Sequence, residues 1–152
     1  MMDFGQRYVL DTNALIRLKR HRRASAFFQD NVVLPDEVLH EAAGFPDIAA
    51  LRKNLYPTTS RVLEWMIRVM ATVPADDKTL VDLYANLGGA DPLVVACALD
   101  GRAEDSQFLT APEWIVVTGD DAVRQKAEEF DLKVITSAEF ASIIDAAEGH
   151  LT

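Results

Sequence analysis

Short apolar runs rich in β-branched residues alternate along the chain with longer segments of helical periodicity, and this alternation restricts the fold more than any other feature. The runs lie at residues 8–10, 32–34, 114–118 and 132–136. A strand that is followed by a helix and a parallel strand forms a right-handed crossover, which places helices on the faces of a parallel sheet. The sequence therefore predicts an α/β fold with a central parallel sheet between helical layers.

Residues that favour helix ends bound several of the helical segments. Pro35 and Pro92 suit the first position of a helix, and Asp91 suits the cap before the second of these helices. Gly44 and Gly101 suit the carboxyl ends of the same helices. These residues predict one helix after the second strand and one long apolar helix before the third.

The segment between the second and third strands predicts a helical insert. Residues 46–71 carry two stretches of helical spacing that Pro57 separates, which is typical of a helical hairpin. Residues 75–89 read as a further helix that ends at its glycine pair, and residues 102–113 read as a polar loop. Ser137 is expected to cap the last helix.

Length and composition favour one domain that spans residues 1–152. The chain has 152 residues, of which 49% are hydrophobic, enough for a core without disulfides. Its one cysteine, Cys97, lies in an apolar run and is expected to pack in the core. The apolar runs are too short to cross a bilayer, and the amino terminus lacks the pattern of a secretory signal. We therefore expect a cytoplasmic protein with no membrane partner.

Charge is unevenly distributed along the chain. A formal net charge of −9 argues against a protein that binds nucleic acid through its overall charge. Residues 17–23, "RLKRHRR", nevertheless form a basic run that could bind the phosphates of a nucleic acid. The alternative is a solvated helix end, where cations meet the negative pole of the helix dipole. The cations of this run are Arg17, Lys19, Arg20, Arg22 and Arg23.

Acidic residues follow the predicted strands. Asp11 comes directly after the first strand, and Asp120 and Asp121 come just after the third. Glu41 lies in the helix after the second strand, and Asp91 begins the apolar helix. Each acid alone could be a helix cap or an exposed residue. Because the carboxyl ends of parallel strands meet at one edge of a sheet, these acids are expected to share a crevice there.

A cluster of carboxylates has a chemical use only when something offsets its charge. Unpaired carboxylates repel one another unless they are protonated or bind cations. Oxygen ligands of this kind suit Mg²⁺ or Mn²⁺, and two such ions can promote the hydrolysis of a phosphodiester bond. The sequence therefore predicts a metal site at which an acidic protein could cleave a nucleic acid.

Four segments in order resemble the acidic motifs of the PIN-domain nucleases, with the VapC-like toxin ribonucleases as the closest type. The segments are "YVLDTNALI", "LPDEVLHEA", "GGADPLVVACAL" and "VVTGDDAV", and they span residues 8–123. The resemblance implies a three-layer α/β/α fold, dependence on a divalent metal and cleavage of RNA. It also implies a homodimer and an antitoxin protein as partner.

The motifs carry the family's functional positions onto this chain. The resemblance assigns Asp11 and Asp91 as primary metal ligands, and Asp120 completes the site. Glu41 either binds metal or orients the attacking water as a general base. Asp121 stays an alternative to Asp120, because neighbouring residues differ in direction. The "TGDDAV" segment lacks the aromatic residue that many toxin-like members carry there. The matched acids are Asp11, Glu41, Asp91 and Asp120, and the supporting polar residues are Asn13 and Thr118.

Other proteins also gather acids at a sheet edge. A haloacid-dehalogenase-like phosphatase needs a second acid two residues after its nucleophile, where this chain has Asn13. A receiver domain needs a late lysine after a strand, where this chain has the acids of "TGDD". The alternative that stays open is a catalytically inactive PIN-like module that binds RNA or a protein partner.

Overall fold

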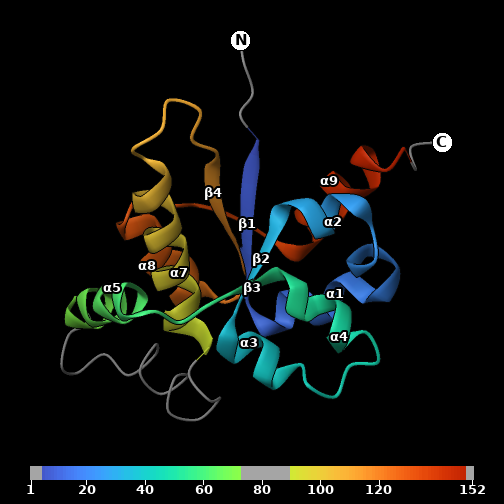
Figure 1. The fold of residues 1–152 in the computed structure, drawn as a ribbon, viewed down its shortest axis with the longest axis horizontal. Coiled ribbons are helices and arrows are strands. Elements are labelled where there is room, and N and C mark those ends of the chain that lie inside the picture. Colours follow the sequence, from blue (N-terminus) through green and yellow to red (C-terminus); the bar gives the residue numbers. More distant parts are fainter. Residues whose placement is uncertain (1–4, 73–89, 150–152) are drawn as a thin grey trace.

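The computed structural model describes residues 5–72 and 90–149, which form a parallel sheet flanked by helices (Figure 1). The strands are β1 (Gln6–Leu10), β2 (Val32–Pro35), β3 (Leu55–Tyr56), β4 (Glu113–Val117) and β5 (Lys133–Ile135). The helices are α1 (Thr12–Arg23), α2 (Ala26–Asn31), α3 (Asp36–Glu41), α4 (Ile48–Leu51), α5 (Ser60–Ala71), α7 (Ala90–Asp105), α8 (Asp121–Glu129) and α9 (Ser137–Ala147), with a 3₁₀ turn at Arg52–Asn54.

The five strands lie in the order β3-β2-β1-β4-β5, and every neighbouring pair is parallel. In the centre of the sheet Tyr8 of β1 lies opposite Val32 of β2 and Ile115 of β4. Helices α5, α7 and α8 cover one face, and α1, α2 and α9 cover the other (Figure 1). The predicted α/β fold with a central parallel sheet is therefore confirmed.

The centre of the sheet is the core of the molecule. Val9 and Leu10 of β1, and Val116 and Val117 of β4, have no exposed surface. Strands that are covered by helices on both faces need apolar residues at every position, not at alternate ones. This requirement explains why the continuous runs in the sequence predicted these strands. Cys97 on α7 is also fully buried, and burial raises the pKa of its thiol to about 12.

The helical hairpin predicted for residues 46–71 is wrong in its first half. Helix α4 is a single turn, and Leu55 and Tyr56 pair with Leu34 and Pro35 as the edge strand β3. Asn54 holds this segment against the sheet, because its buried side-chain amide donates to the carbonyl of Val32 at 2.8 Å. The second half is confirmed as α5, whose Val62 and Val69 are buried.

Gly101 does not end its helix, as predicted, because α7 continues to Asp105. The glycine instead allows close packing against Trp114 of β4. A Cβ atom at position 101 would lie 2.2 Å from an indole carbon of Trp114, too close for any side chain. The indole nitrogen of Trp114 also donates to the Asp105 carboxylate at 2.8 Å. The first part of the segment predicted as a loop, residues 102–105, is therefore helical.

Three other helix boundaries differ from the predictions. Pro35 closes β2 and precedes α3, which ends at Glu41 rather than at Gly44. Thr136 caps α9 through a capping box with Glu139, so Ser137 is the first helical residue. Helix α7 begins at Ala90, one residue before the predicted cap. The helix predicted for residues 75–89 lies outside the described residues.

Within residues 5–72 and 90–149, no helix combines the length and the apolar character that crossing a membrane requires.

Candidate active site at the carboxyl edge of the sheet

Asp11 is the first residue after β1, and the residue is 3% exposed. One oxygen accepts a hydrogen bond of 2.8 Å from the backbone N–H of Ala14, so Asp11 caps α1. The other oxygen accepts a hydrogen bond from the buried hydroxyl of Thr118, which follows β4. Both donors are neutral, and among the described residues no cation forms an ion pair with Asp11. The cap predicted as the alternative role of Asp11 is thus present, but it leaves the charge unpaired.

The surroundings of Asp11 make its ionised form costly. Burial raises the pKa of the carboxyl above its usual value of 3.8, and the negative charge of Asp120 raises it further. The hydrogen bonds from Thr118 and Ala14 and the charge of Arg17 lower it, but they do not reverse the direction. A cation bound beside Asp11 would remove this penalty.

Thr118 connects Asp11 to Asp120. Its hydroxyl donates to Asp11 and accepts a hydrogen bond of 3.1 Å from the backbone N–H of Asp120. The Asp120 side chain in turn caps α8, since one oxygen accepts from the N–H groups of Ala122 and Val123 at 2.8 and 3.1 Å. The second oxygen of Asp120 has no hydrogen-bond partner in the described part of the chain. Asp121 is the first residue of α8 and is exposed.

A cavity of about 140 Å³ opens where β1, β4 and β5 end. Its lining brings together three of the residues singled out by their sequence, Asp11, Asn13 and Asp120, with Arg17 of the basic run. Asp120 rather than Asp121 faces it. The lining residues are Asp11, Asn13, Ala14, Arg17, Gly119, Asp120 and Ser137.

Glu41 lies at the end of α3, close to this site. One of its oxygens accepts a hydrogen bond of 3.1 Å from the hydroxyl of Thr12, the first residue of α1. Partial burial raises the pKa of Glu41, and the charges of Glu37 and Asp11 raise it further. Thr12 is a candidate positioning residue that the sequence interpretation missed, because only the packing of α3 beside α1 places a carboxylate next to its hydroxyl.

The fourth predicted acid, Asp91, lies in the first turn of α7, but the structure describes only its backbone and not its side chain. Among the side chains that the structure describes, no three of His, Cys, Asp or Glu gather closely enough to hold a metal ion. The oxygen donors of Asp11 and Asp120 are nevertheless of the kind that Mg²⁺ and Mn²⁺ prefer. The described residues thus fit a divalent cation in their chemistry, and they would form part of its ligand set.

The basic run does not form one continuous surface. Helix α1 is interrupted at Lys19, whose φ of 66° is rare for a residue with a side chain. Arg17, before this interruption, lines the cavity, and its guanidinium lies 4.0 Å from the place that a Cβ on Gly119 would take. Lys19 and Arg20 are exposed. The interruption therefore separates Arg17 from the other cations of the run.

The last two arginines of the run are engaged within the protein. Arg22 forms an ion pair of 2.8 Å with Asp145 of α9. Arg23 is buried, pairs with Asp47 at 2.9 Å and stacks on the ring of Phe45 at 4.6 Å. A nucleic acid that bound Arg22 or Arg23 would have to compete with these pairs.

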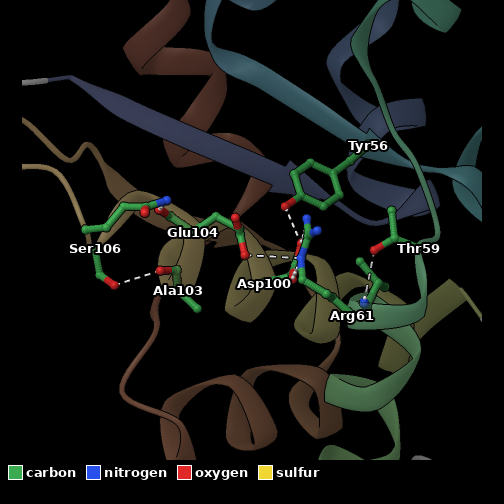
Figure 2. A network of polar contacts seen from close by, with 9 residues as sticks. Tyr56, Thr59, Arg61, Asp100, Ala103, Glu104 and Ser106 are labelled. Carbon is green, nitrogen blue, oxygen red and sulfur yellow. Dashed lines mark hydrogen bonds and ion pairs between the residues drawn. The ribbon is translucent and has the colours of Figure 1, made fainter.

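A second polar network, which the sequence did not reveal, surrounds Asp100 on α7 (Figure 2). The Asp100 carboxylate is 1% exposed and accepts a hydrogen bond of 2.6 Å from the hydroxyl of Tyr56. The Arg61 side chain pairs with Asp100 at 3.2 Å and with Glu104 at 3.1 Å. This network joins β3, α5 and α7, as the labelled side chains in Figure 2 show.

Neither the models of known protein families nor the curated proteins give a match to this chain. Of the resemblance to PIN domains, the structure supports the fold alone, which is a five-stranded parallel sheet between helices.

Proposed function

We propose that the protein is a divalent-metal-dependent endoribonuclease of the PIN-domain type, which hydrolyses phosphodiester bonds of RNA and acts as the toxin of a toxin–antitoxin pair. The observation that carries the proposal is Asp11, a buried carboxylate with neutral partners, which shares a cavity with Asp120 at the carboxyl edge of the sheet. The order of the four acidic motifs supports the same conclusion.

Asp11 and Asp120 are the described residues that would hold the ion, and Asp91 joins them by its motif position. A bound Mg²⁺ or Mn²⁺ would supply positive charge that offsets these carboxylates and the phosphate of the substrate. Thr118 fixes the spacing of the two described acids, because its hydroxyl bonds to the Asp11 carboxylate and to the Asp120 backbone. Asn13 lines the same cavity and provides an amide for the substrate.

Glu41 is the general base in this proposal. Thr12 holds one oxygen of its carboxylate, and the other oxygen has no hydrogen-bond partner among the described residues. The raised pKa of Glu41 makes its carboxylate a better proton acceptor than a glutamate of ordinary pKa. A water molecule at the free oxygen would pass a proton to Glu41 as it attacks the phosphorus, and the bond between the phosphorus and the leaving oxygen of the RNA would break.

An acidic crevice also suggests how an antitoxin inhibits. A partner protein could insert an arginine among the carboxylates, since a guanidinium pairs with a carboxylate through two parallel hydrogen bonds. Copurification of the tagged protein from its native host should then recover a small protein that blocks cleavage. Recovery of the chain alone, or as a homodimer alone, would count against the toxin–antitoxin assignment.

The test of the nuclease is cleavage of labelled total RNA by the purified full chain with Mn²⁺ or Mg²⁺, beside an EDTA control. The decisive comparison is with the double variant Asp11→Asn, Asp91→Asn. A matched control is Asp30→Asn, Asp131→Asn, which removes the same charge from two exposed acids that precede β2 and β5. We expect metal-dependent cleavage by the parent and the control, and none by the double variant.

Two results would overturn the proposal. Equal cleavage by the parent and by the Asp11, Asp91 variant would indicate a contaminating nuclease. Absence of cleavage on diverse RNAs, with or without metal, would favour the inactive PIN-like module that binds RNA or protein.

A further inference from the structure

The cavity beside Asp11 is lined by side chains of two opposite kinds. Asp11 and Asp120 contribute carboxylates, whereas Asn13, Arg17 and Ser137 contribute hydrogen-bond donors. Its volume of about 140 Å³ has room for several water-sized groups. A ligand that fills this cavity must therefore satisfy donors and acidic groups at the same time.

The donors are unused by the protein itself. Within residues 5–72 and 90–149, the side chains of Asn13, Arg17 and Ser137 form no hydrogen bond or ion pair, in contrast to Arg22 and Arg23. Asn13 and Arg17 lie on α1, and Ser137 is the first residue of α9. Two separate helices thus direct unpaired donors to one cavity.

The guanidinium of Arg17 lies beside Gly119. A Cβ at this position would meet a single atom within 4 Å, the Nη1 atom of Arg17. The guanidinium therefore lies over the loop that carries Thr118 and Asp120, while its distance from the carboxylates exceeds that of an ion pair. A group of small size can bind between the guanidinium and the acids.

We propose that this cavity binds a phosphate group of an RNA strand, with Arg17 and Ser137 as its ligands on the protein side. A bare anion would be repelled by Asp11 and Asp120. A phosphate can, however, share a divalent cation with the carboxylates while its remaining oxygens accept hydrogen bonds from Arg17 and Ser137. The inference rests on the proposed function and specifies which cation of the basic run faces the reacting part of the substrate.

The chain offers a matched control for each ligand. Arg17→Met and Arg20→Met remove one charge from an exposed arginine of the same helix, but only Arg17 lines the cavity. Ser137→Ala and Ser142→Ala remove one hydroxyl from α9, but only Ser137 lines the cavity. Arg17→Lys keeps the charge and loses the fork of donors that binds two phosphate oxygens.

The experiment measures binding of a fluorescein-labelled single-stranded uridine RNA to the full chain by fluorescence anisotropy, with Mg²⁺ and over a range of KCl concentrations. All proteins in this assay, the parent included, carry Glu41→Gln, which removes the proposed general base to prevent cleavage and keeps the acids that would hold the cation. We expect Arg17→Met to weaken binding about tenfold or more and to reduce the slope of log affinity against log salt by about 1. Ser137→Ala should weaken binding about threefold. Arg20→Met should weaken it less than Arg17→Met, and Ser142→Ala should have no effect.

Methylphosphonate substitution tests for phosphate itself. In a series of RNAs, a single phosphate is replaced in turn by an uncharged methylphosphonate. At one position the replacement should weaken binding to the parent. The same replacement should not weaken binding to Arg17→Met, which has already lost the contact with that phosphate. Equal losses with Arg17→Met and Arg20→Met, together with an unchanged Ser137→Ala, would overturn the inference. If the parent cleaves RNA in that case, the proposed function stands without it. If the parent does not cleave but the Arg17 and Ser137 effects appear, the phosphate site belongs to an RNA-binding module instead.

Discussion

Asp11 and Asp100 are both buried carboxylates, but their partners are of different kinds. Asp100 lies on α7, where the Tyr56 hydroxyl of β3 and the Arg61 guanidinium of α5 bind its carboxylate (Figure 2). Asp11 receives hydrogen bonds only from neutral donors and has a second acid nearby. A buried charge is costly unless it is paired, so the ion pair with Arg61 accounts for the charge of Asp100, whereas the helix cap that Asp11 forms leaves its charge unpaired. This contrast supports the proposal that Asp11 binds a cation.

Cleavage of RNA should separate the two carboxylates most strongly. Asp11→Asn should lower the rate by on the order of a thousandfold, since a metal ligand contributes several kcal/mol to the stability of the transition state. Asp100→Asn should retain most of the activity. Single-turnover cleavage rates, normalised to the folded fraction of each variant, measure the difference. Similar losses in both variants would show that the contrast between the two carboxylates has no functional meaning.

Metal binding should show the second largest difference between Asp11 and Asp100. Saturating Mn²⁺ should raise the melting temperature of the parent and of Asp100→Asn, because a ligand at a hundred times its Kd stabilises the folded state by about 2.7 kcal/mol. The shift should be absent in Asp11→Asn. Differential scanning fluorimetry with and without EDTA measures it. A shift that survives in Asp11→Asn would place the cation elsewhere.

The stability of the metal-free protein should depend more on Asp100 than on Asp11. Asp100→Ala should lower the free energy of unfolding by about 2 kcal/mol, because the Tyr56 hydroxyl loses a charged hydrogen-bond partner within the protein. Asp11→Asn should not lower it, since an asparagine can still cap α1 without a buried charge. Urea denaturation in EDTA measures both values. A clear loss in Asp11→Asn would mean that Asp11 is mainly a structural cap.

Substitution of Thr12 should have a smaller effect on the cleavage rate and tests whether the hydroxyl positions Glu41. Thr12→Val removes the hydrogen bond to Glu41 and should lower the cleavage rate about tenfold, the lower end of the range for residues that orient a ligand. Thr12→Ser keeps the hydroxyl and should restore the rate. The rate at saturating RNA should change while the KM stays the same. A full rate in Thr12→Val together with a loss in Thr12→Ser would show that the methyl group, rather than the hydroxyl, is what matters.

The smallest effect concerns pH. Because the pKa of Asp11 is raised in the folded protein, the folded state binds more protons than the unfolded state at pH values between 3.8 and the folded pKa. The contribution of Asp11 to stability therefore falls as pH rises through the folded pKa. The difference in unfolding free energy between Asp11→Asn and the parent, measured in EDTA, should increase over the same interval. A difference that is constant with pH would contradict the raised pKa.

Parts of the fold were predictable because they depend on local patterns. The strands around Val9 and Val116 are continuous apolar runs, and such runs are needed wherever helices cover both faces of a sheet. Strand β3 has two residues, Leu55 and Tyr56, and is too short to carry a period. Its place at the edge depends on Asn54, whose contacts with the sheet are not visible in the sequence.

The candidate site divides in the same way. The meeting of Asp11 and Asp120 follows from the rule that parallel strands end at one edge. The separation of Arg17 from Arg22 could not be predicted, because it depends on the backbone at Lys19. Ser137 was expected only as a cap, and its place in the cavity depends on how α9 packs beside α1.

The contact between Gly101 and Trp114 has a further consequence for the length of α7. The indole lies against the helix at Gly101 and is tied to Asp105, so it fixes both the rotation of α7 and its position along the sheet. Asp91 lies ten residues before Gly101, about 15 Å along the axis at the rise of an α-helix. Inserting one residue between them would turn the start of the helix by about 100° relative to Trp114. The number of residues between Asp91 and Gly101 therefore sets the direction that the start of α7 takes relative to Trp114.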